Sequence, residues 1–181
     1  MQYMKTITLK DGRTCVLRNG TTQDGPAALD VFIRTHEQTD YLLTYPDEIT
    51  YTAEQQAEYL QKKADSPNEI EILAEIDGRI VGMAGVDALG TQEKMRHRAE
   101  FGISVDRNYW GLGIGRALTH ACVDCAKAAG YAQLELQAVT ENEHALALYR
   151  SEGFTEYGRN PMGFRSRLTG RQELALMRKE L

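Results

Sequence analysis

Three closely spaced glycines, Gly111, Gly113 and Gly115, are the residues whose spacing points most clearly to chemistry. An apolar, strand-like segment, 99–105, precedes them, and a segment with helical periodicity follows. A glycine-rich turn that opens a helix directs backbone N–H groups at one point, where the positive end of the helix dipole also attracts anions. Because glycine carries no Cβ, a large anion can approach this backbone closely. The pattern therefore predicts a site for a phosphate or pyrophosphate group.

Two common phosphate-binding motifs fit this turn poorly. A P-loop requires Lys and then Ser or Thr after its last glycine, whereas Arg116 and Ala117 follow Gly115. The dinucleotide fingerprint G-x-G-x-x-G would need a glycine in place of Arg116. One feature favours a dinucleotide, because Glu135 lies about 20 residues beyond the turn, where that motif places its ribose-binding acid. A nucleotide-binding oxidoreductase therefore remains as an alternative.

Two segments of the chain carry a resemblance to a known family. Residues 105–118 resemble the acetyl-CoA pyrophosphate loop of the GCN5-related N-acetyltransferases, the GNAT family, and residues 142–154 resemble that family's second signature. The two motifs stand in the family's order and spacing, and the resemblance covers about residues 5–180. It implies a mixed α/β fold with a central, mostly antiparallel twisted sheet, splayed central strands and about four flanking helices. We expect residues 1–181 to form a single domain of this kind.

The resemblance implies that acetyl-CoA is a co-substrate and that no metal takes part. The strand that carries Ile103 and Val105 would bind the pantetheine arm through its backbone, and Asn142 would contact the same arm. Trp110 stands where the family usually has Gln or Arg, so we expect the pyrophosphate cradle to consist of backbone groups. The residues expected to bind the pyrophosphate through their amides are Gly111, Gly113, Gly115 and Arg116.

Acetylation of an amine by a thioester requires a deprotonated amine, a polarised carbonyl and a stabilised thiolate. Tyr149 resembles the family's thiol-facing tyrosine and is the candidate acid, although the helical pattern also fits a core tyrosine. Glu100 is the candidate base, because on a strand it shares a face with Gly102 and Ser104, and small residues suit a cleft. A structural or solvent-facing role for Glu100 stays open. Glu37 and Glu71 are weaker candidates for the base.

Other chemistry-bearing residues are expected to have ordinary roles. Cys122 and Cys125 form a CxxC, but two further ligands at metal-site spacing are missing, so we interpret them as small apolar residues on one helix face. The histidines are expected to be solvated or structural. The aromatic loop 41–45 is expected to line the acceptor side, because the family's acceptor specificity lies in its first helices and the loop between them.

The elements that must position these residues follow from periodicity and turn signals. Asp-Gly pairs at 11–12 and 77–78 predict two antiparallel hairpins, 5–18 and 69–87. Leu29, Phe32 and Ile33 share one face of the first predicted helix. The remaining predicted elements are helices over 24–37, 52–64, from 114 to about 129 and 142–151, strands over 99–105 and 134–138, and two final strands that flank a turn at 158–163.

Composition limits the class of partner. The chain has 181 residues and a formal charge of −5, which argues against nucleic acid, because neutralising phosphates requires a basic surface. The sequence has no run of about 18 apolar residues, so no membrane partner is expected. The three cysteines and the absence of an apolar leader predict a cytoplasmic protein. The family pattern also suggests a homodimer through the last strands.

The sequence thus predicts an acetyl-CoA-dependent N-acetyltransferase that acts on a primary amine of a small molecule, a protein N-terminus or a lysine. Direct attack in a ternary complex is expected, because no cysteine lies on the strand where an acetyl-enzyme would form. The alternative is a non-catalytic acyl-CoA-binding module. Such a module would keep the glycine turn without needing Glu100 or Tyr149.

Overall fold

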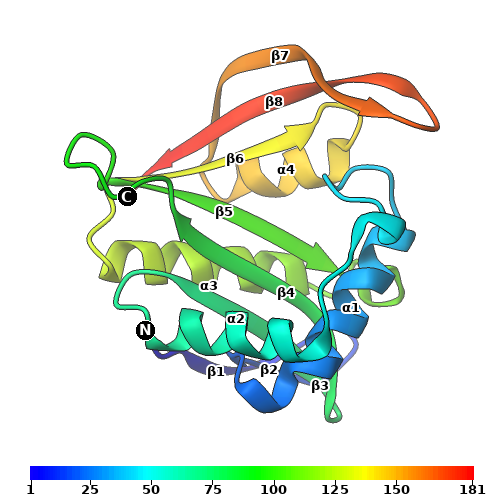
Figure 1. The fold of residues 1–181 in the computed structure, drawn as a ribbon, viewed down its shortest axis with the longest axis vertical. Coiled ribbons are helices and arrows are strands. Elements are labelled where there is room, and N and C mark those ends of the chain that lie inside the picture. The colour runs from blue at the N-terminus through cyan, green and yellow to red at the C-terminus, as the bar shows by residue number, and fades with distance from the viewer.

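The computed structural model describes all 181 residues, and an eight-stranded sheet forms its centre (Figure 1). The strand order is β1-β2-β3-β4-β5-β6-β8-β7, and every neighbouring pair is antiparallel except β5 and β6, which are parallel. The strands are β1 Met4–Thr8, β2 Thr14–Asn19, β3 Ile70–Ile76, β4 Arg79–Ala88, β5 Arg98–Val105, β6 Gln133–Val139, β7 Thr155–Ser166 and β8 Gly170–Glu180. The helices are α1 Gly25–Glu37, α2 Ala53–Asp65, α3 Ile114–Ala128 and α4 Glu143–Ser151. The predicted mixed α/β class with a mostly antiparallel sheet and four helices is confirmed.

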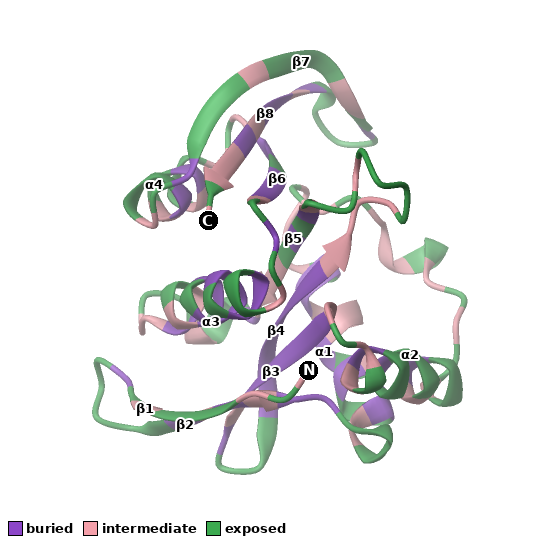
Figure 2. Cartoon of the chain, turned by 90° about the vertical axis from the view of Figure 1, so that its left-hand side faces the viewer, coloured by how far each residue is buried: buried purple, intermediate pink, exposed green.

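The helices cover the two faces of the sheet in pairs. On one face, Val31 of α1 and Leu60 of α2 pack against Leu73 of β3 and Met83 of β4. On the other face, α3 and α4 pack against the central strands, and Figure 2 shows the buried strands β3 and β4 between these layers. Cys122 and Cys125 are buried in this second cluster on one side of α3, as the periodicity predicts. No helix combines the length and the apolar character needed to cross a membrane.

The sheet opens at its centre. Strands β5 and β6 pair only over Arg98–Glu100 and Gln133–Glu135 and have no further pairing beyond these residues. Strand β6 pairs instead with β8 along its whole length, and β8 pairs with β7. The parallel pair is joined through α3, which supplies the long crossover that parallel strands require. The unpaired edges of β5 and β6 therefore leave an opening in the middle of the sheet.

Local turn chemistry explains most element boundaries. Asp77 and Gly78 have φ values of 50° and 76°, as expected for the tight turn of an Asp-Gly hairpin. Helix α2 begins after Thr52, whose hydroxyl accepts from the Gln55 N–H in a capping box. Gly130, with φ +83°, follows the end of α3, where a left-handed residue commonly ends a helix.

One predicted turn lies elsewhere in the structure. The turn expected at 158–163 lies instead at 167–169, because β7 continues to Ser166 with two irregularities in its pairing. Gly163 is needed for packing rather than for a turn, since a Cβ there would clash with the Leu174 side chain of β8. On α1, Leu29, Phe32 and Ile33 are partly buried, and Phe32 packs against the core cluster between this helix and the sheet. The fully buried residues of α1 are Gly25, Ala28, Val31, Thr35 and His36.

Candidate active site

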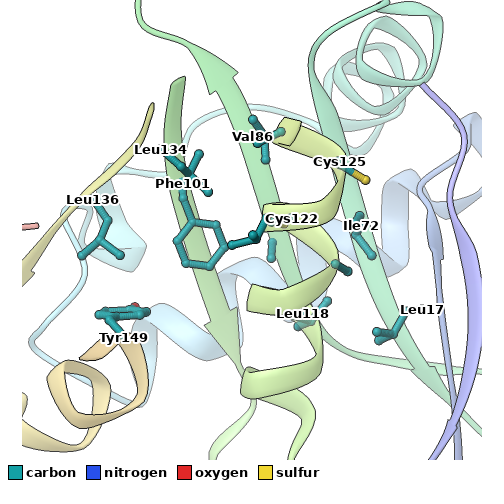
Figure 3. Packing of buried hydrophobic residues seen from close by; sticks show 14 of the residues in the cluster. Leu17, Ile72, Val86, Phe101, Leu118, Cys122, Cys125, Leu134, Leu136 and Tyr149 are labelled. Atoms are coloured by element: carbon teal, nitrogen blue, oxygen red, sulfur yellow. The ribbon is translucent and has the colours of Figure 1, made fainter. Parts of the chain in front are cut away.

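A cavity of about 930 Å³ occupies the opening between β5 and β6. The C-terminal parts of both strands, the turn before α3 and one side of α4 form its walls. Phe101, Leu136 and Tyr149 approach one another from β5, β6 and α4 (Figure 3). The structure brings all nine residues predicted for the site to this one cavity, namely Glu100, Ile103, Val105, Gly111, Gly113, Gly115, Arg116, Asn142 and Tyr149.

The glycine turn has the backbone conformation of an anion cradle. Gly111 and Gly113 have φ values of +78° and +99°, a left-handed region that residues with a Cβ rarely adopt. A Cβ built on either residue would meet no atom within 4 Å, so open space lies in front of the turn. The first backbone bond of α3 runs from the Ala117 N–H to the Gly113 carbonyl, 3.0 Å apart, and no side chain caps the helix. The N–H groups of 114–116 therefore have no partner within the chain.

Two cations lie at the same end of the cavity. Arg116 immediately follows the glycine turn, and its guanidinium contacts the Glu152 carboxylate at 3.4 Å. Lys10, from the loop between β1 and β2, also lines the cavity, and its N–H donates to the Leu112 carbonyl at 3.3 Å. Sequence reasoning did not identify Lys10, because only the three-dimensional fold brings the first hairpin to the start of α3.

Trp110 bridges two walls of the cavity. Its indole N–H donates to the Val105 carbonyl of β5 at 2.6 Å. Its ring also stacks on the His144 ring of α4, with centroids 6.4 Å apart and an angle of 16° between the planes. The Val105 carbonyl is therefore already engaged in this structure. His144, for which a solvated or structural role was expected, lines the cavity.

Asn142 caps the helix that follows it. Its side-chain oxygen accepts from the Ala145 N–H at 3.2 Å and so satisfies one of the free donors at the start of α4. The side chain also lines the cavity, where its amide N–H₂ group forms no hydrogen bond within the chain. An Asn at this position can thus fix α4 and still offer a donor to a ligand.

Tyr149 belongs both to the core and to the cavity wall. Its ring packs edge-on against Phe101 and Phe154, with centroids 6.1 and 6.0 Å away. Burial raises the pKa of the Tyr149 hydroxyl to about 12, so it stays protonated at neutral pH. The hydroxyl has no hydrogen-bond partner within the chain and is not sealed off from solvent. It is therefore a free proton donor at the cavity.

Glu100 lies on the other face of β5. Alternation along the strand turns Phe101 toward Tyr149 and turns Glu100, Gly102 and Ser104 toward the α1–α2 side. Burial raises the pKa of Glu100 above its usual value, and the neighbouring charges of Asp87 and Glu135 raise it further. The Glu100 carboxylate has no cation paired with it and lines the cavity. A carboxylate with a raised pKa accepts a proton more readily than an ordinary one, as a general base must.

The two weaker candidates for the base lie elsewhere. Glu71 on β3 is buried and accepts a hydrogen bond from the Tyr59 hydroxyl at 3.1 Å. Burial, followed by repulsion from Asp87, raises the pKa of Glu71 to about 8. Glu37 is exposed at the end of α1. Neither side chain lines the cavity, so Glu100 is the better placed of the three.

The loop between α1 and α2 forms the outer wall on the α1–α2 side. Residues 41–43 of the predicted loop line the cavity together with Phe164 of β7, whereas Tyr45 does not. Asp40 ties this loop to the β7–β8 hairpin, a role that sequence reasoning missed because its partners in the hairpin lie more than 120 residues away. The side chains that donate to its carboxylate are Ser166 at 2.5 Å and Tyr45, Thr169 and Gln172 at 3.2 Å.

Comparison with known proteins places this fold and site in a family. The model of the acetyltransferase (GNAT) family matches residues 32–154, about two thirds of the sequence, and the chain belongs to this family. The N-alpha-acetyltransferase RimI of Mycobacterium tuberculosis is 40% identical over 93 residues, which are 51% of this chain and 56% of that protein. The chain thus matches little more than half the length of this relative.

Solved structures share the fold over nearly their whole length. An acetyltransferase of the GNAT family from Streptococcus pneumoniae has a TM-score of 0.88 and 27% identity, with 92% of this chain and 99% of that chain covered. The yncA protein of Salmonella typhimurium, a putative acetyltransferase solved with its cofactor acetyl-CoA, has a TM-score of 0.80 at 19% identity, covering 92% and 94% of the two chains. The latter likeness concerns the fold alone.

Proposed function

We propose that the protein is an acetyl-CoA-dependent N-acetyltransferase that transfers an acetyl group to a primary amine by direct attack in a ternary complex. The observation that carries this proposal is one cavity that joins the anion cradle before α3 to Tyr149 and Glu100. Membership of the acetyltransferase (GNAT) family supports the same activity. On this proposal, residues 1–181 work as one catalytic unit.

The chain offers a matching partner for each part of acetyl-CoA. The free N–H groups of the glycine turn and of Arg116 would hold the pyrophosphate, with Lys10 adding positive charge. The unpaired edge of β5, including Ile103, offers backbone groups to the pantetheine amides, and Asn142 offers its N–H₂ group. The Val105 carbonyl would become available once Trp110 releases it. When bound, acetyl-CoA supplies an activated acetyl group as a thioester.

Glu100 would accept a proton and Tyr149 would donate one, from opposite sides of the opening. Only a neutral amine attacks a thioester, so Glu100 would accept the proton of the incoming ammonium on the α1–α2 side. Tyr149, protonated at neutral pH, would donate to the departing sulfur on the α3–α4 side. The acceptor and the thiol would thereby approach through different faces of the sheet, which leaves room for both substrates at once.

Thiol release from acetyl-CoA over a panel of primary amines tests this function. We expect amine-dependent release of CoA, with both substrates required together and no acetylated protein formed by acetyl-CoA alone. Binding of acetyl-CoA without release in the presence of any amine would support the non-catalytic binding module instead. An acetyl-enzyme detected by intact-mass spectrometry would contradict direct transfer.

A further inference from the structure

The charges on the α1–α2 side of the cavity have one sign. Asp87 of β4 and Glu100 of β5 are paired positions on neighbouring strands, and both line the cavity. Asp87 pairs with Lys63 of α2, which does not line the cavity and whose ammonium also contacts Glu69. The cations that do line the cavity, Lys10 and Arg116, lie at the glycine turn.

The outer wall of this side is apolar, and Thr35, Thr39 and Ser104 add hydroxyl groups to the lining. Leu42 and Leu43 of the α1–α2 loop and Phe164 of β7 line the cavity here, together with the ring of Tyr41. The hydrogen bonds from the β7–β8 hairpin to Asp40 hold this wall in place. A molecule on this side therefore meets two carboxylates and a fixed apolar surface.

We propose, on the basis of the proposed acetyltransferase function, that the acceptor is a primary amine on an apolar carbon frame without a free carboxylate beside the nitrogen. The ammonium form is attracted by Asp87 and Glu100, whereas a neighbouring carboxylate is repelled by them. Proteins bind carboxylates through Arg, Lys or the free N–H groups at helix starts. The two helix starts that line this cavity belong to α3 and α4, and both lie on the opposite, α3–α4 side. A free amino acid is accordingly a poor acceptor, and an amide-linked amino terminus is a good one.

Three acceptors with the same carbon frame test this proposal: leucine, leucinamide and 3-methylbutylamine. With saturating acetyl-CoA, we expect kcat/KM for leucine to lie at least about tenfold below both other values, the effect of a like charge roughly 6 Å away in a partly solvated site. Leucine is intermediate in amine basicity, so an effect of basicity alone would place its value between the other two. The proposal places it below both.

A pair of variants at one position tests the effect of adding a cation to this wall, one with the charge and one without it. Leu43 lines the cavity and is 75% exposed, so a polar replacement there removes little core packing. We expect Leu43→Arg to raise kcat/KM for leucine several-fold relative to leucinamide, and Leu43→Gln to leave this ratio unchanged. A value for leucine between those of the other two amines would overturn the inference and leave the proposed function intact. Absence of thiol release with all three amines would contradict the proposed function itself.

Discussion

Replacement of Gly113 by alanine tests the anion cradle, because the structure separates two consequences of a Cβ at this position. Gly113 has φ +99°, so alanine costs about 1–2 kcal/mol of folding stability through backbone strain. The Cβ itself meets no atom of the chain within 4 Å, so the folded protein pays no further steric cost. In the complex, however, this Cβ would stand where the pyrophosphate is proposed to lie.

The expected loss of affinity follows from the hydrogen bonds at stake. Hydrogen bonds to charged groups contribute about 1.5–3 kcal/mol each, so losing one of them weakens acetyl-CoA binding by about 10- to 100-fold. Gly12 provides a matched control: its φ is +87°, its Cβ would also meet nothing within 4 Å, and it does not line the cavity. Gly12→Ala should therefore lower the unfolding free energy by a similar amount and leave binding unchanged.

Calorimetric titration with acetyl-CoA and chemical unfolding of both variants provide the two measurements. The account predicts similar losses of stability for Gly113→Ala and Gly12→Ala, with weakened binding only for the former. Equal affinities of the two variants for acetyl-CoA would refute the assignment of the cradle to the turn before α3.

Three further predictions concern the base, the bridging tryptophan and the acceptor wall. Glu100→Gln should lower the rate at neutral pH by about 10²–10⁴-fold, and the deficit should shrink as pH rises and more amine deprotonates unaided. Because the pKa of Glu100 is raised, the wild-type enzyme should lose activity on acidification at a higher pH than an ordinary carboxylate would cause. A rate that stays constant over this pH range would assign the base to another group. Trp110 is the only tryptophan, so acetyl-CoA should change the intrinsic fluorescence if binding frees the Val105 carbonyl, and unchanged emission at saturation would show that the bridge persists. Asp40→Asn should raise KM for the amine without changing the affinity for acetyl-CoA, since it weakens the tie between the loop and the β7–β8 hairpin; equal effects on both substrates would indicate a general loss of structure.

Local signals explain why most of the fold was predictable. The hairpin at Asp77-Gly78 follows from the conformation that its turn requires, and the start of α2 follows from the cap at Thr52. The errors arise where tertiary packing decides. Gly163 resembles a turn residue in the sequence, yet it is needed because β7 passes close to Leu174.

The features of the site also fall into two groups, those with a local sequence signal and those that depend on tertiary structure. The glycine turn is contiguous in sequence, so its three glycines alone point to an anion. The tie from Asp40 to Ser166 joins positions 126 residues apart, and the cavity position of Lys10 depends on where the first hairpin lies against α3. Such features have no local signature, and only the folded chain reveals them. That no cation lines the cavity beside Asp87 and Glu100, and that Lys63 is already paired, likewise follows only from the folded structure.

Tyr149→Phe provides the most direct test of the central claim that this cavity performs acetyl transfer with Tyr149 as the acid. The change removes one oxygen that has no partner within the chain and preserves the ring that packs on Phe101 and Phe154. The account predicts a fall in kcat of about 10²-fold or more, unchanged affinity for acetyl-CoA, and a smaller loss with an acyl donor whose thiol leaves more easily. Weakened binding with kcat preserved would contradict it, because Tyr149 would then be part of the cofactor wall and not the proton donor.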